Sequence, residues 1–359
     1  MTGQISGKGR KGGARRTSSG PTVSDVARMA GVSLMTVSRV VNGAANVLPA
    51  TRAKVERAIA ALGYVPNPAA RSLAGRLQCR IALLYSNPSA AYLSEFLSGS
   101  LAGAAQSDAQ LIVEHWEGQE GVDAAARRLA ADRIDAVLLP PPLCEHALLL
   151  AALDGADIPA AQVATGKPSA SAHAVTIGDA AAARAMTAHL IGLGHGRIAF
   201  IVGDPNQSAS AMRRSGYEQA MREGGLRIDA DLIVEGDFTY RSGLVAAERL
   251  LTLPEPPTAI FASTDDMAAA VLSVAHRRHL EVPSDLSVCG YDDTAMATNV
   301  WPELTTIRQP VADMARDAVG MLVAAVCARR NGETAGPLRR ELDYGVVIRD
   351  SSGPPRSCD

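Results

Sequence analysis

Residues 22–48 constrain the fold of this chain more than any other stretch, because they predict two short helices joined by a tight turn. Thr22 and Asp25 have the spacing of a capping box, which marks the start of a helix. Gly31 fits the turn, and Ser33 can cap the helix that follows. The segment is therefore predicted to fold as a compact helical hairpin.

The second helix of this hairpin is predicted to expose a polar face. Its valines at 37, 40 and 41 share the inner face. Arginine can bond guanine through two atoms, asparagine can bond adenine in the same way, and methyl-bearing side chains can contact thymine. We therefore predict a helix-turn-helix whose second helix enters the major groove of double-stranded DNA. The alternative is an ordinary hairpin whose polar residues only meet water. The residues left on the outer face are Leu34, Met35, Ser38, Arg39 and Asn42.

Charge is divided sharply between the two parts of the chain. Residues 1–80 contain 13 basic and 2 acidic side chains, whereas residues 81–359 contain 22 basic and 35 acidic ones. The net charge of −2 therefore conceals a head of +11 and a body of −13. A basic segment releases counterions from DNA phosphates, so its binding weakens as salt rises. The division favours a DNA-binding head over an ordinary solvated basic surface, with residues 1–21 as a flexible basic tail.

A third helix is predicted from Pro49 to Leu62, because proline fits the first turn of a helix and a glycine follows the last. Val55, Ile59 and Leu62 share a face and can close a small three-helix core. The sequence PAARSLAG, within residues 67–79, can form only one or two helical turns, which are marginal in water. We expect this segment to fold against another surface, which would couple DNA binding to helix formation.

Residues 80–350 alternate short apolar runs with alanine-rich helical stretches. This alternation predicts a doubly wound α/β fold with parallel sheets. This segment is longer than a chain that usually folds around a single hydrophobic core, so two subdomains are expected. Ligands of such sheets bind at the carboxyl ends of the strands. The predicted strands are 80–86, 109–115, 134–140, 197–203, 259–263 and 286–291.

Several functional classes are not indicated. The five cysteines have no spacing typical of a zinc site, and they predict reduced thiols in a cytoplasm. No phosphate-binding loop and no catalytic constellation is recognisable, so we expect no enzyme, no cofactor and no metal. No apolar stretch reaches membrane length, and residues 1–20 lack the apolar core of a signal peptide, so no membrane partner is expected.

The run DVARMAGVSLMTVSRVVNG, followed by TRAKVERAIAALGYVPNPAARSLAG, resembles the DNA-binding head and hinge of the lactose-repressor (LacI/GalR) family of bacterial transcriptional regulators. Further landmarks of the family recur in order, so the resemblance covers about residues 22–350. It implies a body like the periplasmic sugar-binding proteins, crossed by three strands. The expected parts are a head at 22–66, a hinge helix and linker at 67–79, a first subdomain at about 80–178 and 308–335, a second at about 179–307 and 336–350, and a tail at 351–359.

The resemblance also implies which residues contact DNA. Leu34 and Met35 stand at the family's main base-reading positions, and Arg39 at a second one. Leu73 matches the hinge leucine that, with its twin from a second subunit, wedges into a base step through the minor groove. The alternative for Leu73 is packing against the core of its own head. Positions that touch phosphates or groove walls are matched by Thr22, Ser33, Thr36, Ser38, Asn42, Tyr64 and Asn67.

An effector is implied in the cleft of the body. Arg213 and Asp292 stand at the family's effector-binding positions, where Arg213 can donate to hydroxyl or carboxylate oxygens and Asp292 can accept from hydroxyl groups. The alternative for this pair is a structural salt bridge or a helix cap. Thr264 departs from an asparagine that is frequent there, so the hydrogen bonds to the effector are expected to differ. Other wall and rim positions are matched by Tyr92, Leu93, Phe238 and Gln309.

These features predict a sequence-specific transcriptional repressor that binds a pseudo-palindromic operator as a homodimer, in the cytoplasm and associated with the nucleoid. A small molecule in the cleft, a sugar or sugar acid, would control it. The chain ends without leucine heptads, which favours a dimer over a tetramer. The alternative is a carbohydrate-binding protein without a regulatory role, which would require an export signal and no basic head.

Overall fold

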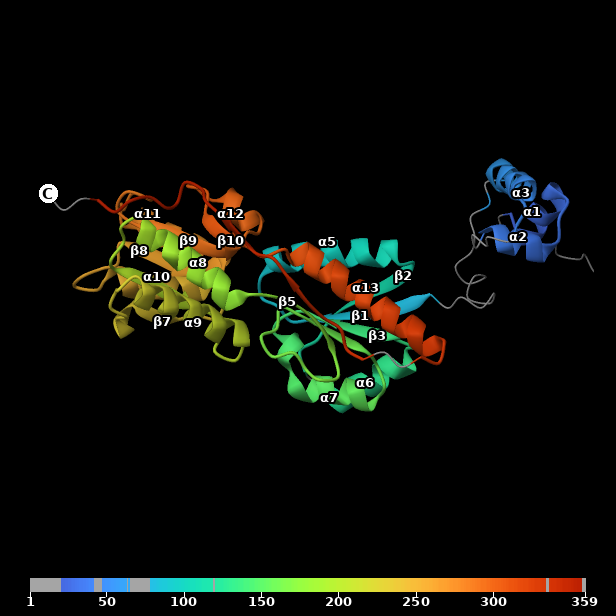
Figure 1. Ribbon diagram of the computed structural model, residues 1–359, viewed down its shortest axis with the longest axis horizontal. Coiled ribbons are helices and arrows are strands. Elements are labelled where there is room, and N and C mark those ends of the chain that lie inside the picture. The colour runs from blue at the N-terminus through green and yellow to red at the C-terminus, as the bar shows by residue number, and fades with distance from the viewer. Residues whose placement is uncertain are drawn as a thin grey trace, which may run out of the picture. The chain divides into compact units, whose positions relative to one another are not determined.

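The computed structural model divides the chain into two compact units, Met1–Gln78 and Cys79–Asp359, each with a hydrophobic core of its own (Figure 1). It describes residues 21–41, 47–62, 64, 78–118, 120–333 and 336–356. The first unit contains the head and the second contains the body.

The head consists of α1 (Val23–Ala30), α2 (Leu34–Val41) and α3 (Pro49–Leu62), as predicted. The capping box at the start of α1 is present, because Thr22 and Asp25 bond each other's backbone N–H groups. Gly31 ends α1 with φ of 65°, a left-handed conformation that glycine adopts without steric cost. These local signals explain why the turn falls where the sequence places it.

The core of the head is small and built from all three helices. Val26, Val37 and Val55, one from each helix, are completely buried. Tyr64 follows α3 and packs into the same cluster. The predicted inward face of α2 is confirmed at Val37 and Val40, and the side chain of Val41 lies outside the described residues.

The first sheet of the body has the strand order β11-β5-β4-β3-β1-β2, and all its strands are parallel. Helices α5 (Ala90–Gln106) and α13 (Val311–Arg330) cover one face, and α6 (Val122–Ala131) and α7 (Ala147–Gly155) cover the other (Figure 1). A short 3-10 helix, η1 (Leu143–Glu145), precedes α7. The strands are β1 (Cys79–Tyr85), β2 (Ala109–His115), β3 (Ala136–Leu139), β4 (Ala160–Val163), β5 (His173–Ile177) and β11 (Arg339–Leu342).

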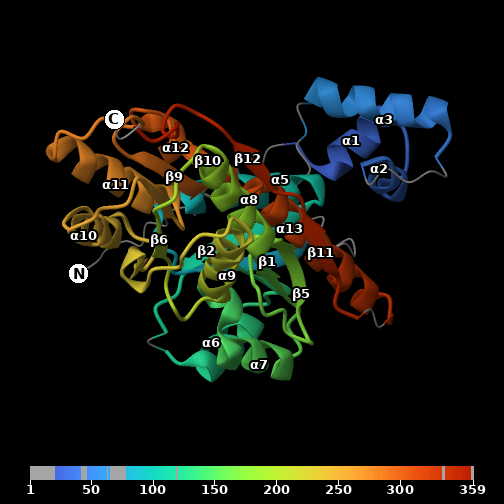
Figure 2. The ribbon, with the colours of Figure 1, turned by 60° about the vertical axis from the view of Figure 1, so that its left-hand side comes forward.

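The second sheet has the order β12-β10-β9-β8-β6-β7, with only β12 antiparallel to its neighbour. Helices α8 (Asp179–Gly192) and α9 (Ser208–Glu223) cover one face, and α10 (Tyr240–Leu251) and α11 (Asp265–Arg277) cover the other (Figure 2). The short α12 (Ala295–Asn299) follows β9. A 3-10 helix, η2 (Ala230–Leu232), and six strands complete it: β6 (Ile198–Val202), β7 (Ile233–Glu235), β8 (Ala259–Ala262), β9 (Ser287–Asp292), β10 (Thr305–Arg308) and β12 (Gly345–Val347).

The chain crosses between the two sheets three times within the described body: after β5, after β10, and between β11 and β12. The sequence assigned all of 336–350 to the second subdomain, and this was wrong for β11. That strand pairs with β5 of the first sheet, and the crossing comes only after Leu342. The strand was missed because its sequence, RREL, is mostly exposed and has no apolar run to mark it.

None of the helices in the described residues combines the length and the apolar character needed to cross a membrane.

Candidate functional site

The exposed face of α2 carries large apolar side chains next to a cation. Leu34 is 54% exposed and Met35 is 65% exposed, and Arg39 is exposed on the same helix. These exposed apolar side chains are not covered by any of the described residues of the head. An exposed Leu, Met and Arg at this spacing can contact thymine methyl groups and guanine edges in a major groove.

The other residues expected to contact DNA differ in how exposed they are. Thr22 and Ser33 are exposed and cap α1 and α2 through their hydroxyl groups. Thr36 and Ser38 are half-buried. Tyr64 is only 6% exposed, so its ring is part of the core of the head instead of lying open at its surface. Three further expected contacts lie outside the described residues: Asn42, Asn67 and Leu73.

The body contains a pocket between its two subdomains, at the carboxyl ends of the strands. Of the seven residues expected at the effector site, six line this pocket, and Leu93 does not. The free space at its centre is about 40 Å³, enough for roughly three water molecules. The cleft is therefore nearly closed. The residues lining it are Asn87, Pro88, Ser89, Tyr92, Pro141, Ala164, Gln207, Ala209, Arg213, Phe238, Thr264, Asp292 and Gln309.

Arg213, on α9, is held by several partners at the base of the pocket. Its Nε donates to Oδ1 of Asp179 at 2.7 Å, and its Nη1 donates to the carbonyl of Ser263 at 2.6 Å. The guanidinium also stacks 3.5 Å from the centre of the Tyr291 ring. Burial opposes the charge on Arg213, but Asp179, Tyr291 and Asp292 together outweigh it and keep the pKa above the ordinary value. Arg213 is therefore a fixed cation.

Asp292 ends β9 and faces the same pocket. Its backbone φ is 106°, which is rare for any residue other than glycine. Burial raises the pKa of this carboxyl well above its ordinary value; Arg213 opposes the shift, and Asp265 adds to it. No hydrogen bond to the Asp292 carboxyl is present among the described residues. This side chain is therefore free to bond a ligand.

Two buried polar atoms at the pocket lack partners within the described structure. They are the hydroxyl of Tyr92 and Nε2 of Gln309. The other end of the Gln309 amide accepts a bond from Arg213 at 3.3 Å, which fixes its orientation. A buried polar group without a hydrogen bond is costly. A ligand with hydroxyl groups would satisfy both atoms.

An aromatic ring forms one wall of the pocket. Phe238 lies with its ring centre 5.8 Å from the Arg213 guanidinium. A side chain on Gly203 would place its Cβ only 2.0 Å from this ring, so glycine is needed there. Thr264 lines the pocket nearby and caps α11 by accepting from the N–H of Met267 at 3.3 Å. The wall thus combines an apolar surface with a hydroxyl group.

Two bridges join the subdomains on either side of the pocket. Glu145, in the first subdomain, accepts from the N–H of Ser208 at 2.9 Å at the start of α9 in the second. The hydroxyl of Ser89 donates to Asp266 at 2.5 Å. The helix dipole favours a carboxylate at the start of α9. These bridges, which we call the cleft bridges, stabilise the closed arrangement.

Sequence reasoning missed the partners that organise this site. Asp179 was not singled out, although it follows a strand, and neither were Glu145 and the Asn87–Ser89 loop. The loop could have been found, because it follows the first predicted strand at its carboxyl end. Among the described residues, no group of three or more His, Cys, Asp or Glu side chains is placed to hold a metal ion.

A head with an exposed recognition helix, joined to a two-subdomain body with a polar pocket, defines the class of ligand-responsive DNA-binding regulators. Residues 22–67 match the profile described as bacterial regulatory proteins, lacI family, and residues 187–352 match that of the periplasmic binding protein-like domain. The chain is 36% identical to the HTH-type transcriptional regulator CelR of Thermobifida fusca, over 92% of this chain and 98% of that one. It is 34% identical to catabolite control protein A of Priestia megaterium, over 92% and 99% of the two chains. The chain belongs to the lacI family of bacterial regulatory proteins.

Solved structures agree with this membership. A transcriptional regulator CelR–cellobiose complex has a TM-score of 0.69 with this chain at 33% identity, covering 92% of this chain and 99% of that one. The lac repressor dimer bound to operator and the anti-inducer ONPF has a TM-score of 0.72 at 28% identity, covering 93% and 100%. The predicted fold class and the prediction of a DNA-binding transcriptional regulator are therefore confirmed.

Proposed function

We propose that this regulator is a homodimeric repressor of a pseudo-palindromic operator, controlled by a neutral sugar bound in the cleft of its body. The observation that carries the sugar assignment is that a fixed Arg213 and an Asp292 carboxyl with no hydrogen bond among the described residues line the same buried pocket. The relative that was solved with cellobiose supports the same ligand class.

The electrostatics of the pocket favour a neutral sugar over a sugar acid. Of the residues that line it, Arg213 is the only cation, and Asp179 already neutralises it at 2.7 Å. Burial is the main cause that raises the pKa of Asp292, and the carboxyls of Asp265 and Asp266 raise it further, so additional negative charge near the pocket is unfavourable. A ligand carboxylate would meet the same repulsion. Hydroxyl groups can donate to Asp292 and accept from Arg213 without adding charge.

DNA recognition is assigned to α2, with Leu34, Met35 and Arg39 reading base edges and the capping residues Thr22 and Ser33 meeting phosphates. We retain Leu73 as the proposed minor-groove wedge. Two heads related by two-fold symmetry would match two half-sites. A repressor acts where the chromosome is, so we place the protein in the cytoplasm, at the nucleoid.

Control by the sugar requires that it bind the operator-free and operator-bound forms with different affinities, typically by about 1–3 kcal/mol. The nearly closed pocket suggests how this difference arises. A sugar ring needs more than the present free space of about 40 Å³, so the cleft must open to admit it. Binding would then shift the equilibrium between the open and closed conformations of the body in both subunits.

The proposal is tested by capturing fragments of the source genome with the purified full-length chain at near-physiological salt. We expect a few palindromic sites to be enriched, and neutral sugars to change their capture at millimolar concentration or below. Diffuse capture that falls uniformly with salt, in the presence and absence of sugar pools, would refute a sequence-specific repressor. Release by sugar acids alone would refute the neutral-sugar assignment and leave the repressor assignment intact.

A further inference from the structure

Two consecutive residues at the pocket have left-handed backbones. Asp292 has φ of 106° and Asp293 has φ of 56°, and neither is glycine. Such conformations persist only where the surroundings impose them. The side chain of Asp292 faces the pocket, so the conformation of this pair decides where the ligand-binding carboxyl points.

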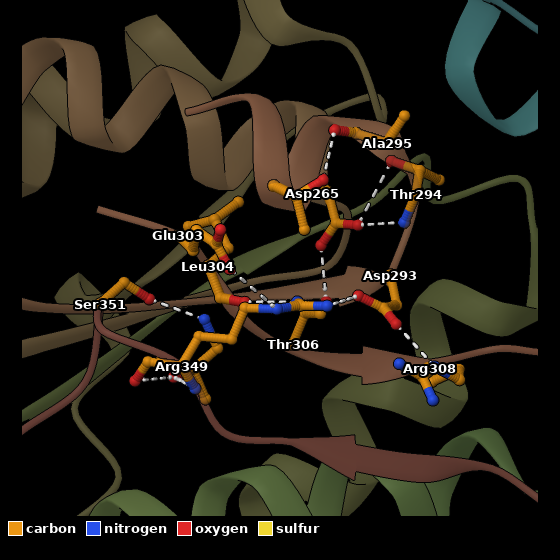
Figure 3. A network of polar contacts seen from close by, with 12 residues as sticks. Asp265, Asp293, Thr294, Ala295, Glu303, Leu304, Thr306, Arg308, Arg349 and Ser351 are labelled. Carbon is orange, nitrogen blue, oxygen red and sulfur yellow. Dashed lines mark hydrogen bonds and ion pairs between the residues drawn. The ribbon is translucent and has the colours of Figure 1, made fainter. Parts of the chain in front are cut away.

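Asp293 turns away from the pocket and is bonded from two sides. Its carboxylate accepts from Nε of Arg308 at 2.6 Å and from Nη2 of Arg349 at 2.6 Å. Figure 3 shows it between these two arginines. The side chain of Arg349 is 14% exposed, whereas that of Arg308 is 60% exposed. The ion pair with Arg349 is therefore less screened by water, and it should be the stronger of the two.

Arg349 is itself rigidly placed. Its Nη1 donates to the carbonyl of Leu304 at 2.8 Å, and its backbone N–H donates to Oγ1 of Thr305 at 3.0 Å. It follows β12, just after the third crossing between the subdomains. Arg349 thus joins Asp293 to the last segment that passes from one subdomain to the other.

The far end of the loop is held separately. The carboxyl of Asp265 accepts from the backbone N–H of Thr294 at 2.8 Å and from Oγ1 of Thr306 at 2.6 Å (Figure 3). On the near side, the N–H of Gln309 donates to the carbonyl of Asp292 at 3.2 Å. The strained pair is therefore fixed at both ends, and Asp293 provides the side-chain contact in the middle.

We propose that Asp293, held by Arg349, is a positioning residue for sugar recognition: it imposes the backbone conformation that aims Asp292 into the pocket. The proposal rests on the proposed sugar-binding function. In this arrangement the third crossing between the subdomains affects ligand binding. A shift of the residues after β12 moves Arg349, and with it the Asp292 carboxyl that binds the ligand. The sugar and the subdomain crossing are thereby connected through Asp292, Asp293 and Arg349.

The alternative is that the Asp293–Arg349 pair only stabilises the fold. A matched control separates the two roles. Arg197 lies at the start of β6 in the same subdomain, and its guanidinium also joins a carboxylate, Asp229 at 3.1 Å, to a carbonyl, Glu255 at 2.8 Å. It does not line the pocket. Arg197→Gln therefore removes a similar contact and leaves the contacts of Asp293 and Arg349 unchanged.

Two measurements on the full-length chain test the proposal. The first is backbone hydrogen exchange without ligand, in peptides that contain the N–H groups of Thr294 and Gln309. The second is calorimetric titration with cellobiose, followed, if the wild type does not bind it, by neutral mono- and disaccharides. The variants are Arg349→Gln, Arg349→Lys and Arg197→Gln, each with its urea midpoint recorded.

For Arg349→Gln we expect about tenfold faster exchange at both N–H groups and about a tenfold weaker sugar Kd, which corresponds to ~1.4 kcal/mol. Arg349→Lys keeps the charge but not both bonds, so it should fall between wild type and Arg349→Gln. Arg197→Gln should change only the urea midpoint.

Equal sugar affinities of Arg349→Gln and Arg197→Gln would overturn the proposal, as would unchanged exchange in Arg349→Gln. If Arg349→Gln does not fold, Arg349→Lys decides by the same criteria. If the wild type binds no sugar, the proposed function fails, while the exchange data still decide whether Arg349 fixes the loop.

Discussion

Arg213 and Asp179 form an ion pair across 2.7 Å between α8 and α9, with side chains only 6% and 4% exposed. Tyr291 donates a further bond to the same Asp179 oxygen at 2.9 Å. Charges removed from water in this way are stable only when they are paired and hydrogen-bonded. The pair therefore fixes the position of Arg213 before any ligand arrives.

We expect Asp179→Ala to lower the free energy of unfolding by about 3–5 kcal/mol, because it leaves the Arg213 guanidinium buried without a counter-charge. Urea denaturation of the full-length chain measures this. Combining it with Arg213→Met should recover much of the loss, since the double variant removes both charges of this pair. A loss below about 1 kcal/mol in the single variant would mean that water reaches the pair.

Asp265 should make stability depend on pH. Burial raises its pKa from the ordinary 3.8 to about 7, and hydrogen bonds from Thr306 and Thr294 only partly oppose this. The folded state therefore favours the protonated acid. This stabilisation is complete below about pH 3.8 and is lost as the pH rises through 7.

Asp265→Asn cannot titrate, so it should remove that dependence. Between pH 4 and 7 the free energy of unfolding of the wild type should fall relative to the variant, by up to about 1.4 kcal/mol per pH unit. Above pH 7 the difference should become constant. Urea curves at pH 5, 6, 7 and 8 check this, and a difference that is the same at every pH would contradict it.

Arg39→Ala should weaken binding to the specific operator by about 1–3 kcal/mol, because a bidentate contact to a base is lost. Binding to a scrambled duplex should change much less. Fluorescence anisotropy at two salt concentrations measures both. The control is Arg28→Ala, which removes an arginine that is 77% exposed from α1 of the same head. An equal loss on both duplexes would assign Arg39 to phosphates.

Removing a cleft bridge should strengthen sugar binding. Glu145→Ala destabilises the closed body, whose pocket is too small for a sugar ring, so the open form that can admit the sugar becomes more populated. We expect sugar association to accelerate and Kd to fall, each by up to about tenfold, with little change in the dissociation rate. Stopped-flow fluorescence measures these rates. Glu248→Gln, which alters an ion pair on α10, is the control, and unchanged rates in Glu145→Ala would show that the bridge does not hold the cleft.

The sequence was most informative where local chemistry decides the structure. The capping box at Thr22, the glycine turn and the proline at the start of α3 located the head helices, because each acts within a few residues. The apolar runs located β1, β2, β3, β6, β8 and β9 in the same way. The edge strand β11 carries no such run, and its pairing depends on a distant partner, β5.

The α/β pattern placed a ligand site at the carboxyl ends of the strands, but the residues of the pocket were anticipated through the family resemblance. Arg213 and Asp292 are 79 residues apart, and no pattern within either segment shows that they meet. Tyr64, expected from the resemblance to touch DNA, has its ring in the core of the head, and no local sequence pattern shows this packing. Contacts such as Asp179 to Arg213 depend on tertiary packing, which sequence periodicity does not encode.

The three crossings also affect how the protein can be made. Both sheets receive their last strands from residues 339–347, at the end of the body. A ribosome therefore releases neither subdomain in finished form until nearly the whole chain has been synthesised. A stop codon just before this region would leave both sheets without an edge strand at the same time. Truncation alleles there should resemble a complete loss of the repressor, although the DNA-binding head is intact.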